Sequence, residues 1–258
     1  MQDTPKDSRE VLAAHLPNRT LRVYEAGGGS TSWLPADVLS RSEIVVVDID
    51  KQQLENNRYA QEKILGNIES CTFPAASFDL IVCFNVIEHL DSPPAAIERF
   101  SEALRPGGLL LIGAPNPRSL SGVVTRYTPH AFHVWYYRVV LKKSDAGHPG
   151  QPPFAVVYHP IVVPEALLAY CKELGLDPVY REDCGSGRDA TAMHTRPWLF
   201  ALLRIAVAAM NLIFLRTRDF GLGDYRVILQ KRGDSRSVTS AHLAINSRAA
   251  VSTGSGAT

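Results

Sequence analysis

The feature that most constrains the fold is the segment 22–31, which reads Arg-Val-Tyr-Glu-Ala-Gly-Gly-Gly-Ser-Thr. An apolar run ends there in an acidic residue, Glu25, and three glycines follow shortly after it. Glycine lets the backbone turn sharply and approach a ligand closely, because no Cβ is in the way. α/β proteins form cofactor pockets in this way at the carboxyl end of their first strand. A plain tight loop would have the same local sequence, so the choice depends on the remaining segments.

Strand-like and helical segments alternate along the chain. Apolar runs predict strands at 21–26, 43–50, 69–73, 78–85, 109–116, 178–182 and 225–230, and helical patterns occur at 8–16, 36–40, 51–60, 93–104 and 164–175. Short continuous apolar strands are typical of a buried parallel sheet, and two of them joined by a helix make a right-handed crossover. We therefore predict an α/β fold with a doubly wound, mostly parallel sheet of seven strands, which the strand at 225–230 closes.

The 258 residues suit one main domain with insertions. We predict a single domain over residues 1–232. Within it, residues 117–163 are rich in aromatic residues, histidine and proline, and a connection of this length at the carboxyl edge of a sheet is typical of a cap or lid. Residues 233–258 are rich in Ser, Thr, Ala and Gly, which predicts a disordered tail.

Composition narrows the class of protein. The formal net charge of +1 argues against general nucleic-acid binding, although residues 1–120 carry −5 and residues 121–258 carry +6. The four cysteines, Cys71, Cys83, Cys171 and Cys184, lack paired spacing, which predicts free thiols in a reducing compartment and no metal site. The polar N-terminus lacks the apolar core of a secretion signal. We expect a cytoplasmic protein.

An apolar segment at 198–215 lies inside a predicted helical insertion at 196–218. It has the minimum length for a membrane span, and Arg204 would cost about 2.5–3.5 kcal/mol at a bilayer centre. We expect this helix to pack on the sheet or in a dimer interface, and the oligomeric state stays open. The alternatives are peripheral contact with an anionic membrane or a cover over an apolar substrate, because Arg196, Arg216 and Arg218 flank the segment.

Several blocks in order resemble a class I methyltransferase that uses S-adenosylmethionine, of the methyltransferase type 11-like group. The acidic residue and glycine turn at 25–29 resemble the first motif, and Asp48 follows Gly27 by 21 residues at the end of the second strand. The blocks 78–90 and 104–112 resemble the fourth-strand and fifth-strand motifs. The resemblance covers about the first half of the chain and implies a Rossmann-like fold with S-adenosylmethionine as cofactor.

The resemblance also implies which residues bind this cofactor. They are Glu25, Gly27, Gly28, Gly29, Asp48, Ile49, Asn67, Ile68 and Asn85. Asp48 would hold the ribose hydroxyls, because a carboxylate accepts two hydrogen bonds from a diol. The family usually has Asp at the position of Asn67, and many members have a further glycine where this chain has Thr31.

A dinucleotide-binding dehydrogenase is the competing interpretation. A Gly-x-Gly-x-x-Gly pattern that starts at Gly27 would need its third glycine at residue 32, and this chain has Ser32 there. The motifs at 88–89 and 105–108 also favour the methyltransferase.

Two histidines are candidates for catalysis. His89 follows the fourth strand and could remove a proton from an acceptor hydroxyl, and His133 is a weaker candidate in the cap. The alternative role for His89 is to order the loop together with Glu88. The alternative role for His133 is to pack with other side chains of the cap.

The functional hypothesis is methyl transfer to a small-molecule, glycan or lipid-linked acceptor, with oxygen as the expected acceptor atom. The resemblance suggests a bacterial setting of glycan or secondary-metabolite modification. A catalytically degenerate protein that binds S-adenosylmethionine as a scaffold is the second hypothesis.

Overall fold

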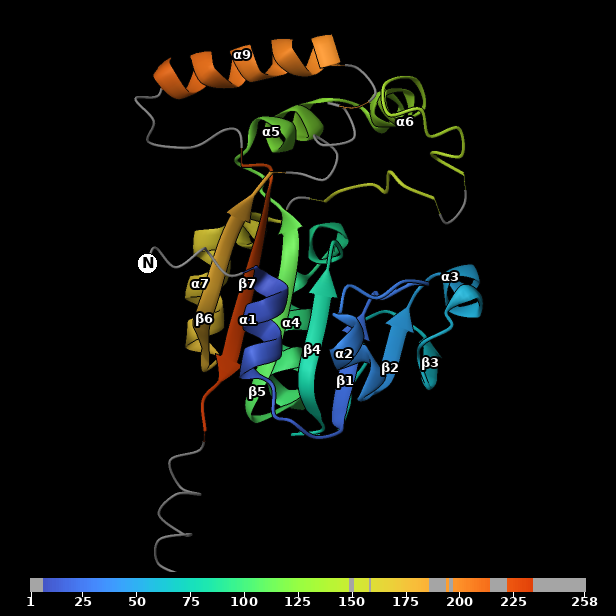
Figure 1. The fold of residues 1–258 in the computed structure, drawn as a ribbon, viewed down its shortest axis with the longest axis vertical. Helices are drawn as coiled ribbons and strands as arrows, with labels where there is room; N and C mark the ends of the chain where they lie inside the picture. The colour runs from blue at the N-terminus through green and yellow to red at the C-terminus, as the bar shows by residue number, and fades with distance from the viewer. Residues whose placement is uncertain are drawn as a thin grey trace, which may run out of the picture.

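The computed structural model describes residues 7–148, 151–157, 159–185, 194, 197–213 and 222–233. Among these residues, seven strands form one sheet in the order β3-β2-β1-β4-β5-β7-β6 (Figure 1). The strands are β1 (Leu21–Ala26), β2 (Ser42–Asp48), β3 (Glu62–Leu65), β4 (Phe78–Phe84), β5 (Leu104–Pro115), β6 (Leu176–Cys184) and β7 (Asp224–Lys231). The helices are α1 (Ser8–His15), α2 (Ala36–Ser40), α3 (Lys51–Asn56), α4 (Pro93–Ala103), α5 (Leu120–Tyr127), α6 (His130–Val139), α7 (Pro164–Glu173) and α9 (Pro197–Ile213), with short 3₁₀ turns η1 (Ile87–His89) and η2 (Pro160–Val162).

The sheet is doubly wound and mostly parallel, which confirms the predicted fold class. β1 lies between β2 and β4 and is parallel to both, with Glu25 opposite Val46 and Val82. The expectation that residues 225–230 close the sheet is wrong, because β7 lies inside it, antiparallel to both β5 and β6. The burial of Val227 and Leu229 fits an internal strand, whereas the edge strand β6 is largely half-exposed.

Helices cover both faces of the sheet. Alternate residues along β2 point to opposite faces: Val45 and Val47 belong to the core under α4 and α7, and Ile44 and Val46 to the core under α1, α2 and α3. This alternation follows from the two-residue period of a strand. It explains why the central strands are apolar along their whole length, since each face buries its own half of the side chains.

Two strands begin at positions that differ from the prediction. The third strand is β3 at Glu62–Leu65 and not 69–73; it is a four-residue edge strand with three exposed side chains, so it has no apolar pattern to detect. β5 begins at Leu104, directly after α4, and the register with β4 shifts between Phe78 and Leu80. The Pro-Gly-Gly segment is therefore part of the strand, and α4 ends before it.

The predicted cap rises above the carboxyl ends of the parallel strands (Figure 1). It contains α5, α6 and η2. The expectation that the apolar helix packs on the sheet is wrong: α9 lies beyond α5 at this same end, and Trp198, Ile205 and Leu212 on it are exposed (Figure 1). Of the predicted tail at 233–258, only Gly233 is among the described residues.

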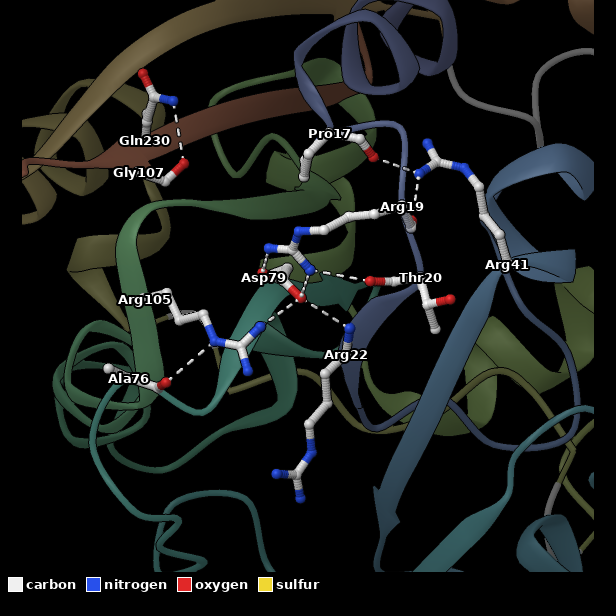
Figure 2. A network of polar contacts seen from close by, with 10 residues as sticks. All are labelled: Pro17, Arg19, Thr20, Arg22, Arg41, Ala76, Asp79, Arg105, Gly107 and Gln230. Carbon is white, nitrogen blue, oxygen red and sulfur yellow. Dashed lines mark hydrogen bonds and ion pairs between the residues drawn. The ribbon is translucent and has the colours of Figure 1, made fainter.

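At the opposite end, a buried carboxylate joins the beginnings of several strands (Figure 2). The side chain of Asp79 is 5% exposed and accepts hydrogen bonds from Arg19 at 2.6 Å, from Arg105 at 2.7 Å and from the backbone N–H of Arg22 at 2.9 Å. Burial opposes ionisation of Asp79, but these hydrogen bonds outweigh it and lower its pKa to about 2. The network thus connects β4 to β1 and β5.

We expect Asp79→Asn to lower the free energy of unfolding by about 2 kcal/mol near neutral pH, because hydrogen bonds to a charged group contribute about 1.5–3 kcal/mol. The folded-state pKa lies below the ordinary 3.8, so this stabilisation is present above pH 3.8 and disappears as the pH falls toward 2. Urea unfolding of both proteins over this pH range measures the difference. Asp177→Asn, which breaks the exposed ion pair with Arg232, is the control and should cost much less. A constant difference across the pH range would contradict the assignment.

Candidate active site

The glycine turn follows β1 at the carboxyl edge of the sheet. Gly27 has φ +68° and Gly29 has φ +54°, and a Cβ at Gly27 would lie 2.5 Å from Cγ2 of Val86. The turn therefore requires glycine at position 27, both for the backbone angle and for the close approach to Val86, which follows β4. Thr31 is not among the residues with positive φ, so the absence of a further glycine there does not disturb the turn.

The carboxylate of Glu25 makes two hydrogen bonds next to this turn. Glu25 is 2% exposed; one carboxylate oxygen accepts a hydrogen bond from the Ser32 hydroxyl and the other accepts one from the Tyr59 hydroxyl at 2.5 Å. Burial raises the pKa of Glu25, and the two hydrogen bonds oppose this shift. Burial and the neighbouring Glu25 raise the pKa of Tyr59, so its hydroxyl stays a donor.

Tyr59 and Ser32 both donate hydrogen bonds to a predicted site residue, Glu25, and neither was predicted from the sequence. The sequence marks Ser32 only as a position where a dehydrogenase would have glycine, whereas in the structure its hydroxyl donates a hydrogen bond to Glu25. Tyr59 lies 34 residues from Glu25, and no local pattern connects the two.

Asp48 ends β2 and faces the glycine turn. Its Oδ2 accepts a hydrogen bond from the backbone N–H of Gly29 at 2.9 Å, and its Oδ1 accepts one from the N–H of Asp50 at 2.8 Å. A carboxylate has about four acceptor positions, so these bonds orient the group and leave about two positions for a ligand.

Apolar side chains lie beside Asp48. Ile49 is 77% exposed, and Leu65, which pairs with Asp48 in the β2–β3 register, is 58% exposed. Leu65 was not predicted, because its strand was misplaced; the end of a correctly placed third strand would have indicated it. Two exposed aliphatic side chains at a strand end can pack against the flat face of a ring.

The remaining predicted cofactor residues differ in what they can offer. Asn67 is exposed, and its side-chain oxygen accepts a hydrogen bond from the N–H of Glu69 at 2.8 Å. Ile68 is 4% exposed and belongs to the core, so its side chain is not available to a ligand. Asn85 directly follows β4 and is exposed with φ +56°, and its N–H donates to Gly113 O at 2.8 Å.

His89 lies in η1, where the sheet meets the cap. Its Nδ1 is 2.5 Å from the carbonyl oxygen of Ala155, and its Nε2 is 3.6 Å from a carboxylate oxygen of the buried Glu88. Because a carbonyl can only accept, Nδ1 carries the proton and Nε2 has the lone pair. Burial lowers the pKa of His89, and the bond to Ala155 opposes part of this shift. The ring is therefore a neutral base at physiological pH.

His133 lines a cavity of about 240 Å³ in the cap. Arg126, Thr128, His130 and the segment 155–157 also line it. The Nε2 of His133 is 2.7 Å from the hydroxyl oxygen of Thr128. Ala155 borders this cavity and also contacts His89, so one stretch of the cap connects the two predicted catalytic histidines. Within the described part of the chain, no group of three or more His, Cys, Asp or Glu side chains could hold a metal ion.

The fold and this site together define a class of protein. The strand order 3-2-1-4-5 is that of a dinucleotide-binding sheet, but the antiparallel β7 between β5 and β6 departs from the classic dehydrogenase order. At the position where a dehydrogenase would have its third glycine, this chain has Ser32, whose hydroxyl donates a hydrogen bond to Glu25. These features are those of a class I methyltransferase.

Comparisons with known proteins agree. A family model described as a methyltransferase domain matches residues 1–177. A probable S-adenosylmethionine-dependent methyltransferase of Mycolicibacterium smegmatis is 32% identical over 108 residues, which are 41% of each chain. A ubiquinone biosynthesis O-methyltransferase of Parvibaculum lavamentivorans is 28% identical over 167 residues, 54% of this chain and 64% of that protein. The crystal structure of the cyclase SpnF shares the fold with a TM-score of 0.54 at 14% identity, covering 88% of this chain and 81% of that one.

The chain belongs to the methyltransferase domain family, and its fold is that of the class I members, whose cofactor is S-adenosylmethionine. The match spans 41% of the length of the Mycolicibacterium relative.

Proposed function

We propose that this protein transfers a methyl group from S-adenosylmethionine to a hydroxyl group of a small-molecule acceptor with an apolar or lipid-linked portion. The observation that carries the proposal is the pairing of the Asp48 carboxylate with the glycine turn at 2.9 Å. It places an oriented carboxylate beside backbone that has no side chains in the way.

The residues present fit this cofactor. Asp48 has acceptor positions left for a ribose diol, and the exposed side chains of Ile49 and Leu65 flank it where an adenine ring would pack. The backbone at Gly27 and Gly29 would lie beside the ligand. Glu25 would support the site without contacting the ligand, since its two carboxylate oxygens accept hydrogen bonds from Ser32 and Tyr59. Asn85 directly follows β4 on the same edge of the sheet and is the remaining residue of the proposed cofactor site.

When bound, S-adenosylmethionine supplies a methyl group on a sulfonium for an in-line displacement. The chain's contribution is alignment of the acceptor and removal of its proton. His89 is suited to the second task, because Nε2 has the lone pair and the neighbouring Glu88 carboxylate, 3.6 Å away, favours the imidazolium that forms.

The acceptor chemistry is inferred from the cap. The cavity lining combines a guanidinium and two imidazoles with Ala155, Val156 and Val157, which suits a hydroxylated molecule with an apolar part. The similarity to a ubiquinone biosynthesis O-methyltransferase over 54% of the chain supports oxygen as the acceptor atom.

Comparative metabolite mass spectrometry tests the proposal. Cells with the Asp48→Ala variant should retain the unmethylated acceptor. Cells that produce the unaltered protein should instead accumulate a product about 14 daltons heavier, since the net change is about one CH₂. Purified protein with labelled S-adenosylmethionine should label the same compound. Cofactor binding without any labelled product would instead support the scaffold function.

A further inference from the structure

The cap end of the molecule exposes large apolar side chains on three helices. We call it the cap face and define it by α5, α6 and α9, which lie together beyond the carboxyl edge of the sheet (Figure 1). Its exposed large apolar side chains are Val124, Tyr127, Phe132, Trp135, Val139, Trp198, Leu202, Ile205, Leu212 and Ile213. Outside the cap, the exposed side chains of this kind that the structure describes are Ile49 and Leu65. The cap face therefore carries most of the exposed large apolar side chains that the structure describes.

α9 is the most apolar element of the cap face. Its 17 residues include Arg204 and Asn211 as the polar side chains of its interior, and Trp198 lies near its start. Its length is about 25 Å at 1.5 Å per residue, less than the roughly 30 Å of a hydrocarbon core. No helix in the described ranges is long and apolar enough to cross a membrane. This helix can lie along a membrane surface without spanning it.

The charge of the cap face indicates which surface would cover it. The three helices carry three basic residues and no Asp or Glu, and the segment 140–148 that follows α6 adds two lysines and Asp145. The basic residues, all exposed, are Arg126, Arg138, Lys142, Lys143 and Arg204. Each basic residue near an anionic bilayer adds favourable electrostatic free energy, and Trp and Tyr favour the headgroup region.

We propose that the cap face binds peripherally to an anionic lipid bilayer, with α9 in the plane of the interface. A second copy of the chain is less suitable, because a two-fold interface brings the same patch against itself and would place the three arginines of the cap face against the same three with no acidic residue between them. In the proposed orientation the cap cavity is close to the bilayer, which gives an apolar acceptor a route to it. The inference rests on the cap face and not on methyl transfer, so either proposal can fail alone.

Vesicle co-sedimentation tests the proposal with the full chain. At low salt the protein should pellet with vesicles that contain phosphatidylglycerol, and the bound fraction should fall at least about fivefold with phosphatidylcholine alone. The double variant Ile205→Asp, Leu212→Asp should lose at least about fivefold of the binding. Both side chains are exposed, so the fold should be retained. Asn18→Asp with Ala75→Asp is the matched control: it adds the same charge at exposed positions beside the amino ends of β1 and β4 and should bind normally.

Tryptophan fluorescence provides a second readout. Trp135 and Trp198 lie on the cap face, whereas Trp33 stacks on Phe84 at the sheet. Emission should shift to shorter wavelength on anionic vesicles, and the variant Trp135→Phe, Trp198→Phe should lose the shift. Absence of pelleting, or equal pelleting of both double aspartate variants, would overturn the proposal. The face would be assigned to self-association instead if the unaltered protein does not bind vesicles, is a dimer in light scattering, and becomes a monomer in the Ile205→Asp, Leu212→Asp variant but not in the control variant.

Discussion

Replacing Asp48 with alanine should weaken binding of S-adenosylmethionine by about 100-fold. A hydrogen bond to a charged group contributes about 1.5–3 kcal/mol, so loss of two bonds to a ribose diol reaches the roughly 2.8 kcal/mol that a hundredfold change in Kd requires. The substitution also removes the acceptor that holds the Gly29 N–H at 2.9 Å. Isothermal titration calorimetry of the purified proteins measures the change directly.

Two further variants separate ligand contact from loop order. Asp48→Asn keeps the size of the side chain but loses one acceptor oxygen, so an intermediate affinity is expected. Asp50→Ala removes the N-cap of α3, where the carboxylate accepts from Gln52 and Gln53. It should cost about 1 kcal/mol of stability and leave the affinity within about twofold. Unchanged affinity in Asp48→Ala, or equal losses in Asp48→Ala and Asp50→Ala, would contradict the cofactor assignment.

Replacing His89 with alanine should lower kcat for the identified acceptor by about 100-fold, because a positioned general base contributes roughly 10²–10⁴-fold. The KM for S-adenosylmethionine should stay within a few-fold, since His89 is not among the residues placed beside the cofactor. Initial rates with labelled S-adenosylmethionine and the acceptor measure both constants.

The pH profile distinguishes a base from a residue that only orders the loop. The pKa of His89 lies below its ordinary 6.5, so activity should be constant near neutrality and fall as the pH drops through that lower value, where Nε2 is protonated. The acidic limb should be absent in His89→Ala. If His133→Ala removes that limb and His89→Ala does not, the catalytic base is His133.

Much of the site could be predicted because its signals are local. The glycine turn needs positive φ at Gly27 and Gly29, and few residues other than glycine tolerate that, so the sequence shows it. Asp48 ends an apolar strand, and adjacent parallel strands bring their carboxyl ends to one edge. The edge strand β3 escaped prediction because exposure on both sides removes the apolar pattern.

The sequence by itself determined the α/β class and the placement of the glycine turn and Asp48 at the ends of the first two strands, because these follow from the local pattern of apolar residues and glycine. Only the tertiary structure decided which side chains meet across long separations. Tyr59 bonds Glu25 from 34 residues away, and Ala155 sets the His89 tautomer from 66 residues away. It also decided that α9 lies exposed on the cap, since an apolar helix has the same sequence whether a core or another surface covers it.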